Sequence, residues 1–436
     1  MSDLTALFAG HIARLQAETE KTLAKTGHRS LVLSSGAPFT YFADDKDAPF
    51  DPVPHFAHWC SLAGPHHILH VVPGRRPRLI RYAPEDYWYE QGGVVDPFWL
   101  DEFEFEEAGT VDTAWKSLGR PEHGVYVGSE TDRADAAHLD INPPGVVARL
   151  DWTRSYKDEY EVRCLEEATT LGARGHVAAR EAFAAGASEL EIHQAFVGAV
   201  GTTEADLPYS TIVALDEKAA TLHYTGKRTV RDGAVLLLDA GAQVRRYACD
   251  ITRTTPAPTC DPRFVALVRA MDSLEQDLVR AARPGRPYLE VHLDAHRGVG
   301  RILSEAGLVK VGADEAYERG LTHPFLPHGV GHHLGIQVHD VAGHQRDAAG
   351  APARPPAEHP FLRNTRTIEP GHVFTIEPGL YFIPMLLRPF REGRDQAAFD
   401  WDAIDALTPK GGIRVEDNVV VTPDGPRNVT REKLAD

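Results

Sequence analysis

Four histidines stand close together in the stretch HGVGHHLGIQVHD, which runs from His328 to Asp340. They are His328, His332, His333 and His339. Imidazole changes its charge near neutral pH and binds metal ions in its neutral form. The stretch is therefore consistent with a metal site, an acid–base relay or a His-rich surface loop.

Two aspartates provide carboxylates that could accompany these histidines. Asp239 and Asp250 lie in two predicted strands that are separated by a short turn. If the hairpin turns between Val244 and Arg245, the two aspartates lie directly opposite each other and point to the same face. The apolar run 235–238 favours burial over a pair of exposed turn acids. Two buried carboxylates repel each other, so the pattern predicts a cation between them.

Two glutamates lie in equally apolar surroundings further along the chain. Glu377 ends the predicted strand of FTIEPG, and Glu416 lies inside GGIRVEDNVVV. Either glutamate alone is more typical of a salt bridge than of a metal ligand. IEPG occurs twice, but Glu369 precedes the strand and is predicted to be a turn residue, so Glu377 is the better candidate ligand.

Two aspartates, two glutamates and one histidine together form a set of donors with four negative charges. One divalent ion cannot use all of them, whereas two ions bridged by shared carboxylates can. Oxygen-rich ligation favours Mn²⁺, Fe²⁺, Co²⁺ or Zn²⁺. Such a centre activates water and polarises a carbonyl, which is the chemistry of hydrolysis.

The elements that would position these residues indicate two domains. A chain of 436 residues exceeds one ordinary core, and we place the boundary near residue 155. Residues 1–155 are predicted to form a small α/β domain with an initial helix ending at Gly27, and residues 156–436 a larger α+β domain. The expected strands of the first domain are 30–36, 66–72, 76–82 and 124–129; the second domain should contain helices at 157–183, 263–282 and 288–306, a helix capped by Ser188 and Glu191, and strands at 210–215, 234–243, 246–254, 336–341, 372–377, 379–383 and 412–421.

Composition excludes several classes of function. A formal net charge of −17 repels nucleic acid and anionic membranes, so neither is an expected partner. The four cysteines have no metal-binding or disulfide spacing. We find no signal sequence and no membrane-spanning run, and expect a cytoplasmic enzyme.

The ordered motifs D-x10-D, HGVGHHLG, TIEPG and GIRVEDN resemble those of the pita-bread metallopeptidases, a group that includes aminopeptidase P, prolidase and the non-metal creatinase. FADDKDAPF (42–50) and APEDYWYE (83–90) look like the bacterial Xaa-Pro dipeptidases, which also resemble the organophosphorus acid anhydrolases. This resemblance implies a pita-bread catalytic domain (156–436) and a creatinase-like N-terminal domain (1–155) that caps the pocket and dimerises.

The resemblance also assigns roles to individual residues. The resemblance implies two divalent ions, for which Mn²⁺ is the first expectation and Co²⁺, Zn²⁺ or Fe²⁺ are alternatives. Asp239 would bind one ion, His332 and Glu377 would bind the other, and Asp250 and Glu416 would bridge the two. Glu377 would also be the general base. The remaining implied residues are His339 and His223 as donors to the substrate, Arg363 for its α-carboxylate, Tyr209 in the pocket wall, Arg414 orienting a ligand, His328 in a supporting or purely structural role, and Asp45 reaching the site of a partner subunit or lying in a solvated turn.

The activity implied is hydrolysis of Xaa-Pro dipeptides by a metal-bridging hydroxide, in a homodimer, with organophosphorus cleavage as a side activity. An enzyme like aminopeptidase P and an inactive pita-bread module that binds peptides are the alternatives. One departure from the family is the sequence Val244-Arg245-Arg246 between the two aspartates. It is a poor tight-turn sequence, so we expect a wider loop there, with Arg246 adding positive charge near the site.

Overall fold

The computed structural model describes residues 3–88 and 97–434, and the last two residues of the APEDYWYE motif lie outside these ranges. The described chain divides into two compact units, Met1–Arg163 with Gln345–Ala351, and Cys164–His344 with Pro352–Asp436. The first unit thus extends past the expected boundary at residue 155. It also includes a short segment from the second half of the sequence, where Gln345 Nε2 donates a hydrogen bond to the carbonyl oxygen of Ala148 at 3.0 Å.

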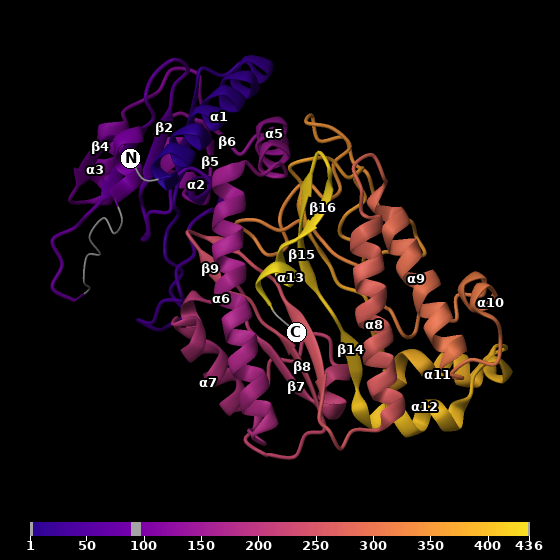
Figure 1. Cartoon of the computed structure of the whole chain (residues 1–436). Coiled ribbons are helices and arrows are strands. Elements are labelled where there is room, and N and C mark those ends of the chain that lie inside the picture. The colour runs from indigo at the N-terminus through magenta and orange to yellow at the C-terminus, as the bar shows by residue number, and fades with distance from the viewer. Residues whose placement is uncertain (1–2, 89–96, 435–436) are drawn as a thin grey trace. The chain divides into compact units, whose positions relative to one another are not determined.

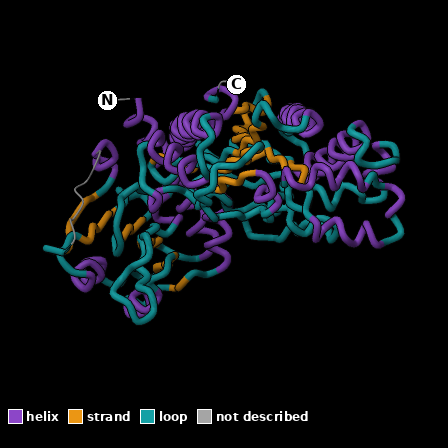
Figure 2. Tube along the Cα trace, turned by 90° about the horizontal axis from the view of Figure 1, so that it is seen from below, coloured by secondary structure: helices purple, strands orange, loops and turns teal. Residues whose placement is uncertain are grey.

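A six-stranded mixed sheet forms the centre of the first unit, in the order β4-β3-β2-β1-β5-β6. Apolar residues of α1 recur at helical spacing and are buried, among them Phe8, Ile12, Leu15 and Leu23. Figure 1 labels most elements of this unit, and Figure 2 distinguishes helices from strands by colour. The elements are α1 Asp3–Thr26, β1 Ser30–Ser34, α2 Pro54–Ala57, β2 Ile68–Val71, β3 Arg78–Tyr82, η1 Pro97–Glu102, β4 Glu104–Ala108, α3 Val111–Leu118, β5 Gly124–Val127, α4 Thr131–Ala136, β6 Asp140–Ile141 and α5 Pro144–Arg154.

The second unit contains two three-stranded sheets, in the orders β11-β8-β7 and β12-β15-β16. Its first half comprises α6 Glu159–Ala184, which begins in the first unit, α7 Glu189–Val200, η2 Glu204–Asp206, β7 Ile212–Leu215, η3 Asp216–Ala220, β8 Val235–Asp239, β9 Gln243–Val244, β10 Tyr247–Ala248 and β11 Thr252–Pro256. The second half comprises α8 Pro262–Ala281, α9 Tyr288–Glu305, α10 Ala313–Glu318, β12 Val373–Ile376, β13 Gly379–Tyr381, α11 Pro384–Glu392, η4 Gln396–Ala398, α12 Trp401–Leu407, η5 Thr408–Lys410, β14 Gly412–Arg414, β15 Asp417–Thr422, β16 Gly425–Asn428 and α13 Val429–Lys433.

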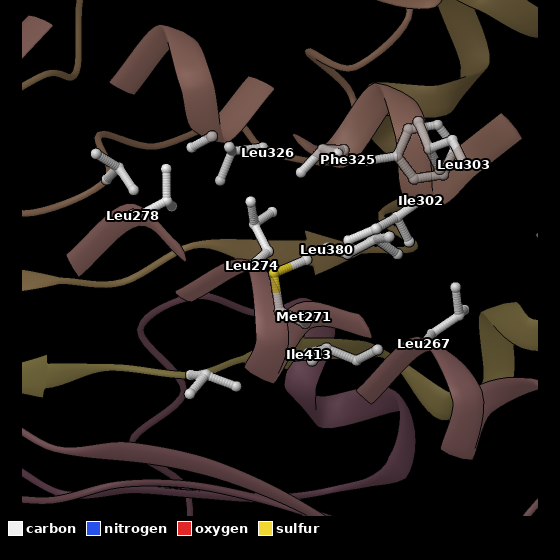
Figure 3. Packing of buried hydrophobic residues seen from close by; sticks show 14 of the residues in the cluster. Leu267, Met271, Leu274, Leu278, Ile302, Leu303, Phe325, Leu326, Leu380 and Ile413 are labelled. Atoms are coloured by element: carbon white, nitrogen blue, oxygen red, sulfur yellow. The ribbon is translucent and has the colours of Figure 1, made fainter. Parts of the chain in front are cut away.

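The helices of this unit pack their apolar faces against the strands. The largest core cluster joins α8 and α9 to β12, β13 and β14, and Figure 3 shows Met271, Leu274, Ile302 and Leu380 meeting in it. A second cluster joins α6 and α7 to β7 and β8. Burial of this kind contributes about 25 cal/mol per Å² of apolar surface, so these clusters hold the strand ends that carry the site.

The capping box at the start of α7 is confirmed, because Ser188 accepts from the backbone N–H of Glu191 and the Glu191 side chain accepts from the N–H of Ser188. The predicted strand at 336–341 is wrong, since these residues form bends. Alternating apolar residues suggested a strand there, but the neighbouring backbone bonds of the loop go to β12 instead, as from Leu334 N to Val373 O at 3.0 Å. No helix among the described residues has the length and apolar character needed to span a bilayer.

Candidate metal and active site

The hairpin that carries the two aspartates has a different register from the predicted one. Asp239 pairs with Thr252, not with Asp250, and the turn consists of Arg245 and Arg246 between the paired residues Val244 and Tyr247. The expected wider loop is also wrong. Both arginines adopt positive φ, 49° and 73°, which is the conformation of a two-residue type I′ turn.

The register error does not separate the aspartates. The true pairing is shifted by two residues, and side chains alternate with a period of two, so the two carboxylates still share a face. Arg245 points to α6, where its Nη1 contacts Glu167 Oε2 at 2.8 Å. Gly241, between β8 and β9, lies opposite Asp250, and a Cβ there would lie 2.1 Å from the carbonyl oxygen of Cys249. The glycine therefore permits the close approach of the two strands.

His332 is held in place by its own loop and by β12. Its backbone N–H donates to Thr375 Oγ1 at 3.2 Å, and its carbonyl accepts from Thr375 N at 2.9 Å. Its Nδ1 donates to the carbonyl oxygen of His333 at 3.0 Å, so Nε2 is the ring nitrogen that faces the site. Gly331 precedes it with φ 152°, and a Cβ there would lie 2.0 Å from the carbonyl oxygen of Thr375. The glycine of this motif thus allows the loop to lie against the strand.

The Nε2 atom of His332 faces three carboxylates. Nε2 lies 3.5 Å from Asp250 Oδ2, 3.7 Å from Glu377 Oε1 and 3.9 Å from Glu416 Oε1. Asp250, His332 and Glu416 are buried and offer ligand atoms within 4.8 Å of one another. Glu377, which directly follows β12, keeps 16% of its side chain exposed.

A backbone bridge brings Glu416 to the hairpin. Glu416 N donates to the carbonyl oxygen of Thr252 at 3.0 Å, and Thr252 Oγ1 donates to Glu416 Oε2 at 2.8 Å. This bridge joins the two halves of the second unit at the carboxylate cluster. Arg414 lies on the same segment and donates through Nη2 to Asp239 Oδ2 at 2.5 Å.

The electrostatics of the cluster call for additional positive charge. Burial raises the pKa of Asp239, and burial together with the neighbouring carboxylates raises that of Glu416 well above its ordinary value. Burial also raises the pKa of Glu377 to about 7. Burial opposes ionisation of Asp250 as well, but the hydrogen bond and charge of His332 hold its pKa below the ordinary value.

The donor set fits divalent cations. Four carboxylates meet one arginine and one histidine, so they are not neutralised by protein groups. Asp239 Oδ1 is buried and has no hydrogen-bond partner among the residues that the structure describes. Oxygen donors with a single imidazole suit hard or borderline metals.

Tyr381 was missed by sequence reasoning, although it connects two residues that were predicted. Its hydroxyl accepts from Arg414 Nη1 at 2.8 Å and donates to His328 Nε2 at 2.9 Å. Burial lowers the pKa of His328 to about 4, so this imidazole is neutral, and its Nδ1 donates to the Gly329 carbonyl. The sequence EPGLY contains no pattern that indicates this role for Tyr381. Thr252, by contrast, could have been found two residues after Asp250 on the same strand face.

The other predicted residues lie around this cluster. Tyr209 donates to Asp250 Oδ1 at 2.6 Å. The His339 ring is perpendicular to that of His332, with centroids 4.4 Å apart. Burial, and then the charges of His332 and Arg363, lower the pKa of His339 to about 4. His223 is exposed and influences the pKa of both His328 and His339.

Asp45 is the remaining predicted site residue. It belongs to the first unit, in an exposed segment closed by a bridge between Thr40 and Asp47. Within the second unit, direct contacts join the predicted residues Asp239, Asp250, His332, Glu377, Glu416, Tyr209, His328, His339 and Arg414, whereas Arg363 and His223 act on His339 through their charges. The catalytic and binding roles of all these residues stay predictions.

Comparison with known protein families assigns the chain. Residues 163–423, more than half of the chain, match the model described as metallopeptidase family M24. The chain belongs to metallopeptidase family M24. Residues 6–152 of this M24 metallopeptidase match the Xaa-Pro dipeptidase N-terminal domain. The expected family and its α+β, pita-bread fold with a smaller N-terminal domain are confirmed.

Relatives of this M24 metallopeptidase extend over its full length. It is 39% identical over 441 residues to a Xaa-Pro dipeptidase of Proteus mirabilis, covering 99% of both chains. It is 40% identical over 439 residues to one of Aeromonas hydrophila, also covering 99% of each. Among solved structures, proline aminopeptidase P II from Yersinia pestis superimposes with a TM-score of 0.73 at 23% identity, over 98% of this chain and 97% of that one. Aminopeptidase P from E. coli with the inhibitor Pro-Leu gives 0.73 at 22%, over 96% and 95%. These structures share the fold.

Proposed function

We propose that this M24 enzyme is a dipeptidase that hydrolyses Xaa-Pro dipeptides with a C-terminal proline. The observation that supports it best is the cluster of three carboxylates, those of Asp250, Glu377 and Glu416, around His332 Nε2. The full-length relatives at 39–40% identity, which are named Xaa-Pro dipeptidases, support the choice of substrate.

Two divalent ions would be held by Asp239, Asp250, His332, Glu377 and Glu416. We expect Mn²⁺, and Co²⁺, Zn²⁺ or Fe²⁺ are compatible with the same oxygen-rich donors. When bound, the ions would supply Lewis acidity toward the attacking water and the peptide carbonyl. Arg414 fixes the orientation of Asp239, and Thr252 that of Glu416.

We expect Glu377 to transfer the proton between the attacking water and the leaving nitrogen. Among the four carboxylates it keeps the largest exposed fraction, 16%, against 12% for Asp239 and 3% for Glu416. It would accept the proton of the attacking water and deliver it to the proline nitrogen, which leaves as the secondary amine when the C–N bond breaks. Proline forms a tertiary amide, so its nitrogen needs a proton in order to leave.

The surrounding residues would bind the dipeptide. His339 and His223 would donate to the oxyanion that forms when the carbonyl is attacked. Arg363, which is exposed and acts on His339, would bind the α-carboxylate of proline in a bidentate pair. A cation that binds the terminal carboxylate limits the substrate to two residues.

A metal-reconstituted assay tests this function. We expect Ala-Pro to be hydrolysed and Ala-Pro-Ala to be cut at least about tenfold more slowly. Glu377→Gln should lower kcat by roughly 10²–10⁴-fold, and Arg363→Ala should raise KM for the dipeptide. Faster cleavage of the tripeptide would indicate an enzyme like aminopeptidase P. A chain that takes up no divalent ion and stays inactive with Mn²⁺ would indicate a peptide-binding module.

We further propose a homodimer in which the segment around Asp45 reaches the partner subunit. This segment presents apolar side chains to solvent, with Phe42 100% and Phe39 66% exposed. Such residues mark contact surfaces. Sedimentation of the wild type as a dimer and of Phe42→Asp as a monomer is expected, and a monomeric wild type would contradict the dimer.

Two finer points belong to the same proposal. The four cysteines are free and buried, which suits the reducing cytoplasm.

The water activated at this site can also attack phosphorus, so we expect measurable hydrolysis of a fluorophosphate that is lost in Glu377→Gln. Retention of that hydrolysis in the variant would assign it to another site.

A further inference from the structure

A cavity of about 200 Å³ in the second unit is lined by five histidines, namely His328 beside the carboxylate cluster and four others that lie outside that cluster. His292 and His296 lie on α9, His323 follows α10, and His359 lies in the loop that leads to Arg363. None of the five residues of the carboxylate cluster lines this cavity.

The spacing along α9 explains half of this arrangement. His292 and His296 are four residues apart, so both project from the same face of the helix, and both are buried. A His-x-x-x-His pair on a helix is a common way of presenting two imidazoles to one metal ion. The pair is visible in the sequence EVHLDAHRG, but the two partners that complete the cluster come from separate loops.

The four rings form a continuous cluster. Centroids are 4.8 Å apart for His292 and His296, 4.5 Å for His292 and His359, and 4.9 Å for His296 and His359. His323 lies 5.1 Å from His296 and 5.4 Å from His359. His292, His296 and His359 each offer a ring nitrogen, and these three atoms lie within 4.8 Å of one another.

Hydrogen bonding distinguishes this cluster from ordinary core histidines. Both ring nitrogens of His292 are buried and have no hydrogen-bond partner within the described part of the chain. A buried polar atom without a partner is costly, and a core histidine normally has its nitrogens satisfied. His296 Nδ1 is hydrogen-bonded to Thr322 Oγ1 at 2.9 Å, which fixes that ring and leaves Nε2 for another partner. A hydrogen bond to the second nitrogen is the usual support of a metal-binding imidazole.

Burial also keeps these imidazoles in the form that binds metals. Burial, and then the neighbouring histidines, lower the pKa of His292 to about 3 and that of His296 to about 2. Burial lowers the pKa of His323 and His359 as well, while Glu358 opposes the shift in both. Neutral imidazoles are ligands, whereas four charged ones would repel each other.

We propose that His292, His296 and His359, with His323 or Glu358 as a fourth donor, form a second metal site that binds an imidazole-preferring ion such as Zn²⁺. Imidazole nitrogen suits zinc, and tetrahedral zinc has Zn–N bonds of about 2.0 Å. Such bonds place ligand nitrogens about 3.3 Å apart. Nitrogens that lie within 4.8 Å of one another would therefore move closer by at most about 1.5 Å when the ion binds, and the cavity gives them room. This site offers three or four imidazole ligands, whereas the carboxylate cluster offers one, so the two sites should prefer different metal ions.

Zinc binding to the full-length, Mn²⁺-loaded enzyme tests the site. We expect one equivalent of Zn²⁺ to stay bound through desalting while the manganese content, measured by elemental analysis, does not change. X-ray absorption at the zinc edge, where manganese is silent, should report at least three imidazoles. A zinc shell rich in oxygen with a single imidazole, or zinc bound only at the expense of manganese, would place the ion in the carboxylate cluster and overturn the proposal.

Two variants and a control complete the test. His359→Asn changes a loop residue and His292→Asn a helix residue, and each should weaken zinc binding by more than the roughly 10–100-fold that loss of a supporting residue costs. His123→Asn is the matched control, because His123 is exposed and has φ 50°, which asparagine tolerates. Manganese content and Ala-Pro hydrolysis report whether each variant is folded. Zinc binding that is unchanged in a folded His359→Asn or His292→Asn contradicts the assignment.

Discussion

The relay from Asp239 through Arg414 and Tyr381 to His328 links a metal-ligand candidate to a neutral histidine. Within this relay the hydroxyl of Tyr381 connects Arg414 to His328. His328 in turn lies 3.6 Å from Glu377. The tyrosine hydroxyl therefore sets the orientation of the arginine that holds Asp239 and of the histidine beside Glu377.

Tyr381→Phe tests this relay at the scale of a single atom. The ring stays in the core, but Arg414 and His328 lose a shared partner, and we expect kcat for Ala-Pro to fall by about 10–100-fold with bound metal largely retained. Tyr317→Phe, which removes a hydroxyl from a ring packed on Arg297, should leave kcat unchanged. Full activity of Tyr381→Phe would show that the hydroxyl only fills space.

Removal of metal should expose the repulsion among the buried carboxylates. We expect a chelator to lower the melting temperature by several degrees, because ΔΔG of about 1 kcal/mol shifts Tm by a few degrees in a unit of this size. Glu416→Gln replaces the carboxyl whose ionisation the cluster opposes with a neutral amide, so the metal-free variant should melt above the metal-free wild type. Differential scanning fluorimetry with and without chelator measures both. A metal-free wild type as stable as the Mn²⁺ form would mean that the carboxylates are not in conflict.

At the scale of elements, the loop that carries His332 depends on its fit against β12. A Cβ on Gly331 would lie 2.0 Å from Thr375 O and 2.2 Å from the Tyr288 hydroxyl. Both atoms are fixed, since Tyr288 donates to the Thr375 carbonyl at 2.7 Å. The loop, rather than the strand, has to move if this glycine is replaced.

Gly331→Ala should therefore displace His332 and weaken metal binding, with activity reduced by at least about 100-fold. Gly198→Ala is the control, since a Cβ at Gly198, inside α7, meets nothing within 4 Å. That change should stabilise the helix by about 0.5–1 kcal/mol. Metal titration of the two variants checks the difference, and an active, metal-replete Gly331→Ala would show that the loop can adjust.

The sequence predicted most elements but not how they meet. Periodicity located the long helices and the strands that carry Asp239 and Glu377, because these have strong apolar patterns. The hairpin register was wrong, since Arg245 and Arg246 adopt positive φ that their residue type does not announce. The bridge from Thr252 to Glu416 and the four-histidine cluster join segments far apart in the chain, so no local pattern encodes them.

At the scale of the whole molecule, acid stability depends on buried neutral histidines such as His67 in the first unit. His67 Nε2 donates to the Ala63 carbonyl at 2.7 Å, and Nδ1 accepts from Tyr82 N at 3.0 Å. A proton on Nδ1 would oppose that N–H donor. Burial lowers the pKa of His67 from 6.5 to about 4.

The folded pKa of His67 lies below the unfolded value, so the unfolded chain binds the proton first as the pH falls. The contribution of His67 is complete above about pH 6.5 and is lost as the pH approaches 4, by about 2 kcal/mol at pH 5. His67→Gln should make the loss of stability between about pH 7 and pH 5 smaller by that amount. Urea unfolding followed by fluorescence measures it, because Trp59, Trp99 and Trp115 are buried in this unit. Equal pH dependence in the variant would mean that the pKa of His67 does not differ between the folded and unfolded states.

The segment Gln345–Ala351 makes the first unit discontinuous in the gene. A Cβ on Gly350 would approach Ala148 Cβ to 2.8 Å, and Gln345 bonds to the same residue. Recombination between relatives that exchanged residues 1–163 alone would leave this segment against a foreign surface. We therefore expect substitutions at Ala148 and in residues 345–351 to depend on each other, so an exchange of residues 1–163 between relatives should include this segment.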